Sequence, residues 1–158
     1  MRKLAAIIAL TLALAGCAST PQVEAKDVWI KSSEMSQIGG MTGLFGTITN
    51  NSSKDIVFIG GETDAAGIVE VHEMAMIEGE MKMQEIDGGI VIPAGQSIVL
   101  EPGGNHLMLM ALNADILAGD KINVTLKFDG ADDLVLTGVM AKPAEGGDED
   151  YHSGEMDN

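Results

Sequence analysis

Apolar and polar residues alternate along most of this chain with the two-residue period of β-strands. The run from Ile122 to Phe128 is the clearest example, because every second residue is apolar and this predicts a strand with one buried face. A helical turn near residues 111–117 fits the pattern but is not required by it. Other short runs are also rich in strand-forming residues: 28–32, 42–49, 56–59, 67–76, 90–92, 97–100, 106–112 and 134–140.

Turn-forming residues divide these runs at short intervals. Examples are Gly60-Gly61, Gly88-Gly89 and Asp129-Gly130, whose glycines and aspartate favour tight turns. Many short strands at this spacing predict an all-β sandwich or barrel. Residues 27–142, about 115 in number, have a suitable size for one domain with a single core and are too few for two.

The N-terminus differs from this predicted domain. Residues 4–15 form an apolar run behind a positively charged start, which is too short to span a bilayer and is typical of an export signal. The segment Leu14-Ala15-Gly16-Cys17 fits a bacterial lipobox. We therefore expect a signal peptide at 1–16, a lipidated Cys17, and a tether that extends to residue 26. Ordinary signal peptidase cleavage nearby is the alternative.

The chain is strongly acidic. Its formal net charge is −15, and removal of Arg2 and Lys3 with the signal leaves seven bases against 24 acids, or −17. This balance excludes nucleic acid as a partner and opposes binding to an anionic membrane surface. The acyl chains would therefore hold the protein at the membrane. Residues 143–158 carry six acids and no base, a composition that predicts an acidic disordered tail.

Cysteine usage restricts the chemistry further. Cys17 is the only cysteine of the chain, and its lipidation would leave the mature protein without a free thiol. Blue-copper sites, thiolate-bridged dinuclear copper centres and thiol-disulfide oxidoreductases all need cysteine, so these classes are excluded.

Residues 72–110 carry the most unusual group of side chains. They contain two of the three histidines and six of the eleven methionines within 39 residues. Strand spacing places them on shared faces in three sets: His72, Met74 and Met76; Met81 and Met83; His106, Met108 and Met110. Methionine alone is a common core residue, but core packing does not explain why a histidine begins two of the sets. Imidazole and thioether are soft, uncharged ligands that suit Cu(I) and not Mg²⁺ or Ca²⁺.

The spacing of these residues is also specific. Ten residues separate His72 from Met83, and 22 residues separate Met83 from the triplet His106-Leu107-Met108. This pattern resembles the signature of the PCuAC family of periplasmic copper chaperones, with one extra residue that we expect in the turn Asp87-Gly88-Gly89. The resemblance extends over most of residues 27–140, through Val28-Trp29-Ile30, Met41-Thr42-Gly43-Leu44-Phe45, Ile48-Thr49-Asn50, Ile92-Pro93-Ala94-Gly95 and residues 102–109.

The resemblance implies a fold and a ligand set. The fold would be a cupredoxin-like Greek-key β-sandwich in a single domain, and one Cu(I) ion would be bound by His72, Met83, His106 and Met108. Accessory metal ligands would come from the remaining residues of this kind: Met74, Met76, Met81, Met110, His152 and Met156.

The implied function is that of a lipid-anchored, non-enzymatic copper(I) metallochaperone in the bacterial cell envelope, facing the periplasm or the extracellular side. Its acceptor would be apo-cytochrome c oxidase subunit II, at the dinuclear copper centre, or another copper acceptor. Because an acceptor must reach the ion, we expect the ligands after the turn at 102–105 to lie exposed at one end of the sandwich. Spare methionines such as Met74 and Met110 would form an apolar rim.

Two other function classes stay open at this point. A copper storage or resistance protein would bind several Cu(I) ions per chain, whereas a chaperone would bind one tightly. A copper or zinc hydrolase or oxidase would need a third histidine or a carboxylate at the site. Glu73 is adjacent to His72 but points to the opposite face of the strand.

Overall fold

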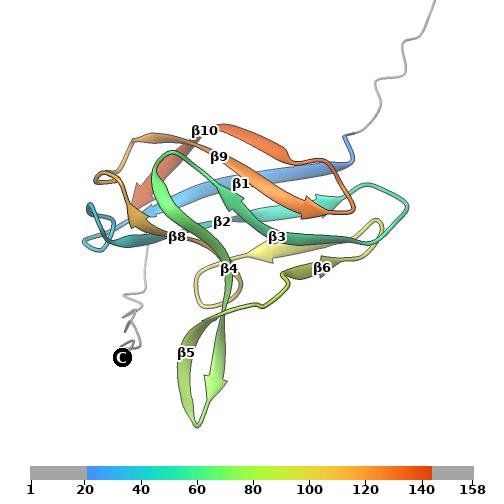
Figure 1. The fold of residues 1–158 in the computed structure, drawn as a ribbon, viewed down its shortest axis with the longest axis horizontal. Coiled ribbons are helices and arrows are strands. Elements are labelled where there is room, and N and C mark those ends of the chain that lie inside the picture. The colour runs from blue at the N-terminus through green and yellow to red at the C-terminus, as the bar shows by residue number, and fades with distance from the viewer. Residues whose placement is uncertain (1–20, 144–158) are drawn as a thin grey trace, which may run out of the picture.

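The computed structural model describes residues 21–143, and all regular structure in this range is β-strand (Figure 1). The strands are β1 (Val23–Ser32), β2 (Met41–Asn50), β3 (Ile56–Glu62), β4 (Ala66–Ile77), β5 (Glu80–Glu85), β6 (Ile90–Ile92), β7 (Ser97–Leu100), β8 (His106–Leu112), β9 (Lys121–Asp129) and β10 (Leu134–Pro143). The all-β prediction is confirmed. The described residues contain no helix with the length and hydrophobicity that a membrane span requires.

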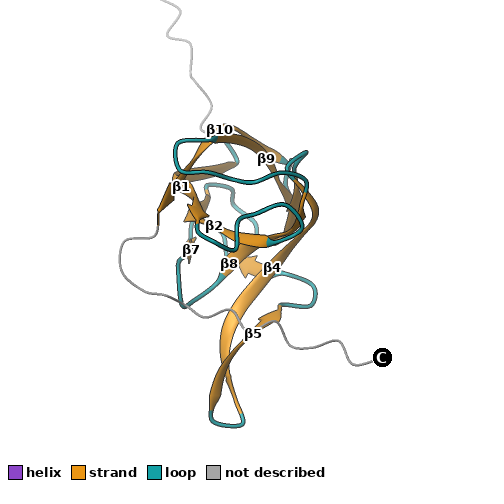
Figure 2. Ribbon diagram, turned by 90° about the vertical axis from the view of Figure 1, so that its left-hand side faces the viewer, coloured by secondary structure: helices purple, strands orange, loops and turns teal. Residues whose placement is uncertain are grey.

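The strands form one hydrogen-bonded sheet in the order β5-β4-β8-β2-β1-β10-β9-β3-β6, with β7 paired to β2. The first and last strands, β1 and β10, run parallel to each other. Figure 2 shows the sheet curving around one central core, with β10 and β9 on the side opposite β8 and β4. This arrangement places β4 and β8, which carry both predicted histidine ligands, next to each other.

The core is built from alternate residues of the strands. In β9 the apolar residues from Val124 to Phe128 are buried, as the alternation predicted. β8 differs, because its first four residues are all buried. Leu107 and Leu109 belong to the main core, so His106 and Met108 lie on the opposite face of the strand. The sheet is therefore covered on both faces at the start of β8.

The structure differs from the expected elements in two places. β1 begins at Val23, inside the expected tether, because Val23 is buried and residues 23–26 pair with β2. β5 was not among the expected strands. Its only apolar residues are two methionines, and its four remaining residues are polar or charged. The helical turn that the pattern left open near 111–117 is not formed, because residues 111 and 112 end β8 and the next five residues are bends and irregular backbone.

The β4–β5 hairpin projects beyond the rest of the sheet in both views (Figures 1 and 2). Its two strands pair from His72 with Glu85 to Ile77 with Glu80. Two residues close it, Glu78 and Gly79, both with positive φ of 53° and 88°. This is the geometry of a type I′ turn, whose twist matches that of the strands, and glycine adopts the second position without strain.

Candidate metal centre

The two predicted histidine ligands face each other across neighbouring strands. β4 and β8 are antiparallel, and their register places His72 directly opposite His106. The centroids of the two imidazole rings lie 6.0 Å apart. Both side chains are buried, with His72 7% and His106 1% exposed. Buried ring nitrogens need partners, so the contacts of each nitrogen indicate what the site can bind.

The contacts of His106 define which of its nitrogens carries the proton. Nδ1 lies 3.1 Å from the carbonyl oxygen of Gly104, and a carbonyl only accepts hydrogen bonds, so Nδ1 donates. In a neutral ring, Nε2 then carries the lone pair. Nε2 lies 3.3 Å from Sδ of Met83. Two electron-pair donors therefore face each other, which is how two ligands of one soft cation would be arranged.

His72 has the opposite tautomer. Its Nε2 lies 3.1 Å from a carboxylate oxygen of Glu70, which accepts the proton of Nε2. Nδ1 carries the lone pair in the neutral ring, and this atom is buried without a hydrogen-bond partner within the described part of the chain. A buried nitrogen without a hydrogen-bond partner needs an explanation. A metal ion bound at Nδ1 would give the lone pair a partner.

Met83 reaches the histidines because of the β4–β5 hairpin. The pairing places Met83 opposite Met74, one step along the hairpin from His72 on the same face. The amide of Met74 donates to the Gly104 carbonyl over 3.3 Å, and the same carbonyl accepts from His106. The loop before β8 therefore holds the base of the hairpin against His106.

Met108 completes the group on β8. It lies two residues after His106 on the same face, is 0% exposed, and pairs with Gly43 of β2 and Glu70 of β4. Phe45 packs against this side of the sheet, with its ring centroid 6.2 Å from that of His106. Met108 and Phe45, which are both buried, thus enclose one side of the site with apolar groups.

The donor set fits a soft monovalent ion. A tetrahedral ion with metal–nitrogen and metal–sulfur bonds of about 2.0 and 2.3 Å would hold its N and S ligands about 3.5 Å apart, close to the 3.3 Å between His106 and Met83. Within residues 21–143, no three His, Cys, Asp or Glu side chains gather into a group that could hold a metal. Any metal held here would therefore need the methionine sulfurs, which soft ions prefer.

A family model described as "Putative lipoprotein LpqE-like" matches residues 23–140 of the chain. The chain belongs to the LpqE-like family. A relative from Leifsonia xyli subsp. xyli, described as "Putative lipoprotein Lxx21020", is 38% identical in an alignment of length 154 that covers 92% of this chain and 92% of the relative. Both descriptions name lipoproteins, which agrees with the prediction that this chain is a lipoprotein.

Solved PCuAC domains have the same fold as this LpqE-like chain. The apo PCuAC domain of PmoF1 has a TM-score of 0.61 at 17% identity and covers 79% of this chain and 98% of its own. Apo-DR1885 of Deinococcus radiodurans has a TM-score of 0.56 at 25% identity, over 92% of this chain and 97% of its own. The Cu(I) form of DR1885 covers 78% and 81%, with a TM-score of 0.51 at 25% identity. The PCuAC resemblance and the cupredoxin-like fold are thus confirmed.

The other candidate residues lie outside this inner group. Met81 pairs with Met76 farther along the hairpin, so Met83 is the sulfur that contacts His106. Met110 pairs with Met41 and Ile68 at the other end of the site. Cys17, His152 and Met156 lie outside the described residues. Glu73 hydrogen-bonds to Gln84 on the opposite face of the hairpin, as its position predicted.

Two features of the LpqE-like site were not expected. Glu70 was overlooked, although its position two residues before His72 places both on one strand face. The expectation of exposed ligands is wrong for His106 and Met108, which are buried. The reason is that β4 and β2 flank β8 and the buried ring of Phe45 packs against His106. Among the four predicted ligands only Met83 is partly exposed, and it connects the site to the surface of the hairpin.

Glu70→Ala is expected to weaken Cu(I) binding about 10- to 100-fold, the usual cost of losing a residue that orients a metal-bound histidine. Without the carboxylate, His72 loses the contact that favours the Nε2–H tautomer. Long-range ¹H–¹⁵N NMR spectra of the apo-protein should then show a changed tautomer for His72 and an unchanged one for His106. Glu70→Gln, which keeps an oxygen acceptor, is the control and should retain most of the affinity.

Gly43→Ala is expected to lower the free energy of unfolding by about 1–3 kcal/mol, the range for overpacking a buried site. A Cβ at Gly43 would lie 2.6 Å from Cζ of the Phe45 ring, and Phe45 is buried against His106. Denaturant unfolding measures the loss. The control is Gly67→Ala, where the nearest atom is 3.4 Å away. It should leave stability unchanged or raise it by about 0.4–1 kcal/mol.

Proposed function

We propose that this protein is a lipid-anchored copper(I) metallochaperone that binds one Cu(I) tightly through His72, Met83, His106 and Met108. The observation that carries the proposal is the arrangement of lone pairs. Nδ1 of His72 is buried without a hydrogen-bond partner in the described structure, and Nε2 of His106 faces the Met83 sulfur at 3.3 Å.

The ligand chemistry favours Cu(I) over Cu(II). Two neutral imidazoles and two thioethers do not compensate a second positive charge, and sulfur prefers the monovalent ion. The solved Cu(I) form of DR1885, which has the same fold, supports this choice of metal. The carboxylate of Glu70 contacts Nε2 of His72, so its role is to orient the imidazole.

Delivery requires ligand exchange and no catalysis. A thiolate or thioether of the acceptor would replace one ligand at a time, beginning with Met83, because this is the most exposed of the four ligands. The acceptor we propose is the copper-free cytochrome c oxidase subunit II. Lipidation at Cys17 would keep the domain at the cell-envelope membrane, near such an acceptor.

Titration of the full chain with Cu(I) under reducing, anaerobic conditions tests the binding proposal. One tight equivalent is expected, and X-ray absorption should show a mixed nitrogen and sulfur shell. Cu(II) should bind this site more weakly. A shell dominated by oxygen, or one without sulfur, would contradict the proposal. Several equally tight equivalents would favour copper storage.

Cys17→Ser is expected to release the protein from the membrane fraction without changing its Cu(I) affinity. The lipidation site and the metal ligands are far apart in the sequence, so we expect the two properties to be independent. Fractionation of cells and a competition titration measure the two properties separately. A wild-type protein that is already released into the soluble fraction would show that Cys17 is not lipidated.

A further inference from the structure

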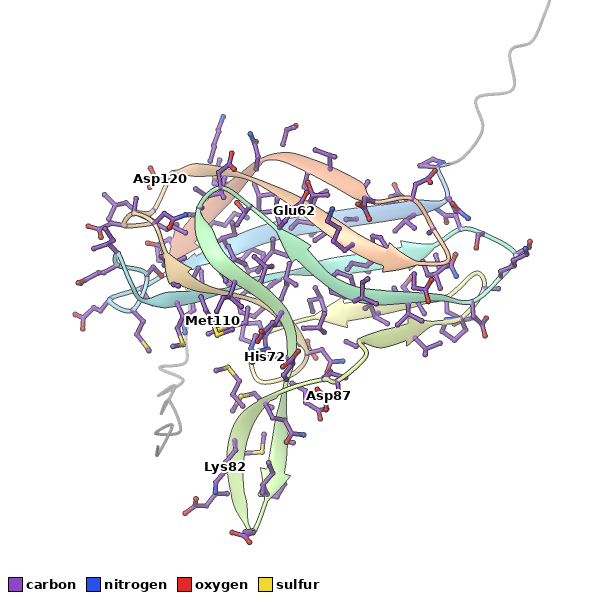
Figure 3. All side chains as sticks on the ribbon, in the orientation of Figure 1. Glu62, His72, Lys82, Asp87, Met110 and Asp120 are labelled. Carbon is purple, nitrogen blue, oxygen red and sulfur yellow. The ribbon has the colours of Figure 1, made fainter. Side chains whose placement is uncertain are left out.

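The β4–β5 hairpin carries a second group of thioethers beyond the inner site. Two Met-x-Met sequences face each other on it, because Met74 pairs with Met83 and Met76 pairs with Met81. Residues directly opposite each other share one face of a hairpin, with Cβ atoms about 4.5–5.5 Å apart. All four methionines lie on the same face as His72. Figure 3 shows sulfur atoms along the hairpin between the labelled His72 and Lys82.

Core packing does not explain the outer methionines. Met76 is 66% exposed and Met81 is 51% exposed, although methionine usually fills gaps in a core. β5 lies at the end of the strand order and pairs with β4 alone among the described strands. The outer pair of thioethers therefore faces solvent, where a dissolved ion can reach it.

The charge of the hairpin also favours a cation. Residues 73–85 contain four glutamates and one lysine, and Lys82 lies 3.8 Å from one of them, Glu80. An acidic surface attracts cations from solution. Thioethers discriminate among the attracted ions, because they bind Cu(I) and not the hard divalent ions.

The inner site needs a route to the surface. His106 and Met108 are 1% and 0% exposed, so an ion does not reach them directly from solvent. Met83 contacts His106 and pairs with Met74, and it therefore belongs to both the inner and the outer group. A thioether that two neighbouring sites can share allows an ion to pass between them by exchange of one ligand at a time.

We propose that Met74, Met76 and Met81 form a second Cu(I) site, composed of three thioethers and weaker than the inner one, through which the ion enters and leaves. The proposal rests on the proposed function of the inner site. The outer site is weaker because it lacks imidazole and is open to water. The projecting hairpin would then be the part of the protein that first binds the incoming ion.

The test is a Cu(I) titration of the full chain carrying methionine labelled with ¹³C at the methyl group. Cu(I) is diamagnetic, so each methyl resonance reports its own sulfur. During the first equivalent the resonances of Met83 and Met108 should shift. During the second, those of Met76 and Met81 should shift, while those of Met35 and Met140, which are exposed elsewhere, should not.

Two double variants make the test specific. Met76→Leu/Met81→Leu should lose the second binding step and load the inner site more slowly, with the affinity of the first step unchanged. Met35→Leu/Met140→Leu is the matched control and should behave as wild type. Absence of a second step in the wild type, or its persistence in the hairpin variant, would overturn the outer site. Shifts at Met76 and Met81 without any at Met83 and Met108 would instead refute the proposed function of the inner site.

Discussion

Met83→Leu is expected to weaken Cu(I) binding by about 100-fold or more, above the 10- to 100-fold loss typical of residues that only orient a ligand. The Met83 sulfur lies 3.3 Å from Nε2 of His106, so the substitution removes a direct donor. Leucine has nearly the volume of methionine, and Met83 is only partly buried. The fold should therefore be kept. Competition with a Cu(I) chelator of known affinity measures the change.

Met81→Leu is the matched control for this prediction. Met81 lies on the same strand and the same face two residues away, but it pairs with Met76 near the tip of the hairpin. We expect the first binding step to change by less than about tenfold, below the range for residues that orient a ligand. Equal losses in the two variants would mean that Met83 is not a primary ligand, and Met81 would be the first candidate to replace it.

β9 could be predicted well because its burial follows simple alternation. The apolar residues of the run 122–128 all point to one face of the strand, and this face packs against the core. β5 could not be predicted in this way. It has no core-facing residue, and its strand structure comes from pairing with β4 across the turn at Glu78 and Gly79. Pairing with β4, and not the apolar pattern of 80–85, therefore explains why this segment is a strand.

The histidine ligands could be predicted from the sequence, but their tautomers could not. Strand spacing and the family resemblance identified His72 and His106, and the register then brought them together. The tautomers could not be predicted, because they depend on the Gly104 carbonyl and the Glu70 carboxylate. These contacts arise from the loop before β8 and from residues that the copper signature does not include.

The prediction of an exposed site was the main error. The observed burial of His106 and Met108 changes how delivery should work. A turn before His106 suggested an exposed end of the sandwich, but the flanking strands and Phe45 enclose that histidine. An acceptor therefore does not approach His106 directly. It would meet the hairpin first, where Met83 and the outer thioethers are accessible.

The Cu(I)-loaded protein is expected to load a copper-free fragment of cytochrome c oxidase subunit II faster than a small chelator of equal Cu(I) affinity does. Equal affinity makes the driving force the same, so a faster rate reports a direct ligand exchange within a complex. His106→Ala should abolish the advantage, because it removes the nitrogen that faces Met83 and with it the site that holds the ion until the acceptor binds. Stopped-flow absorbance of the dinuclear copper centre follows the transfer. If the protein and the chelator load the fragment at the same rate, then the ion passes through solution and the protein acts as a copper store.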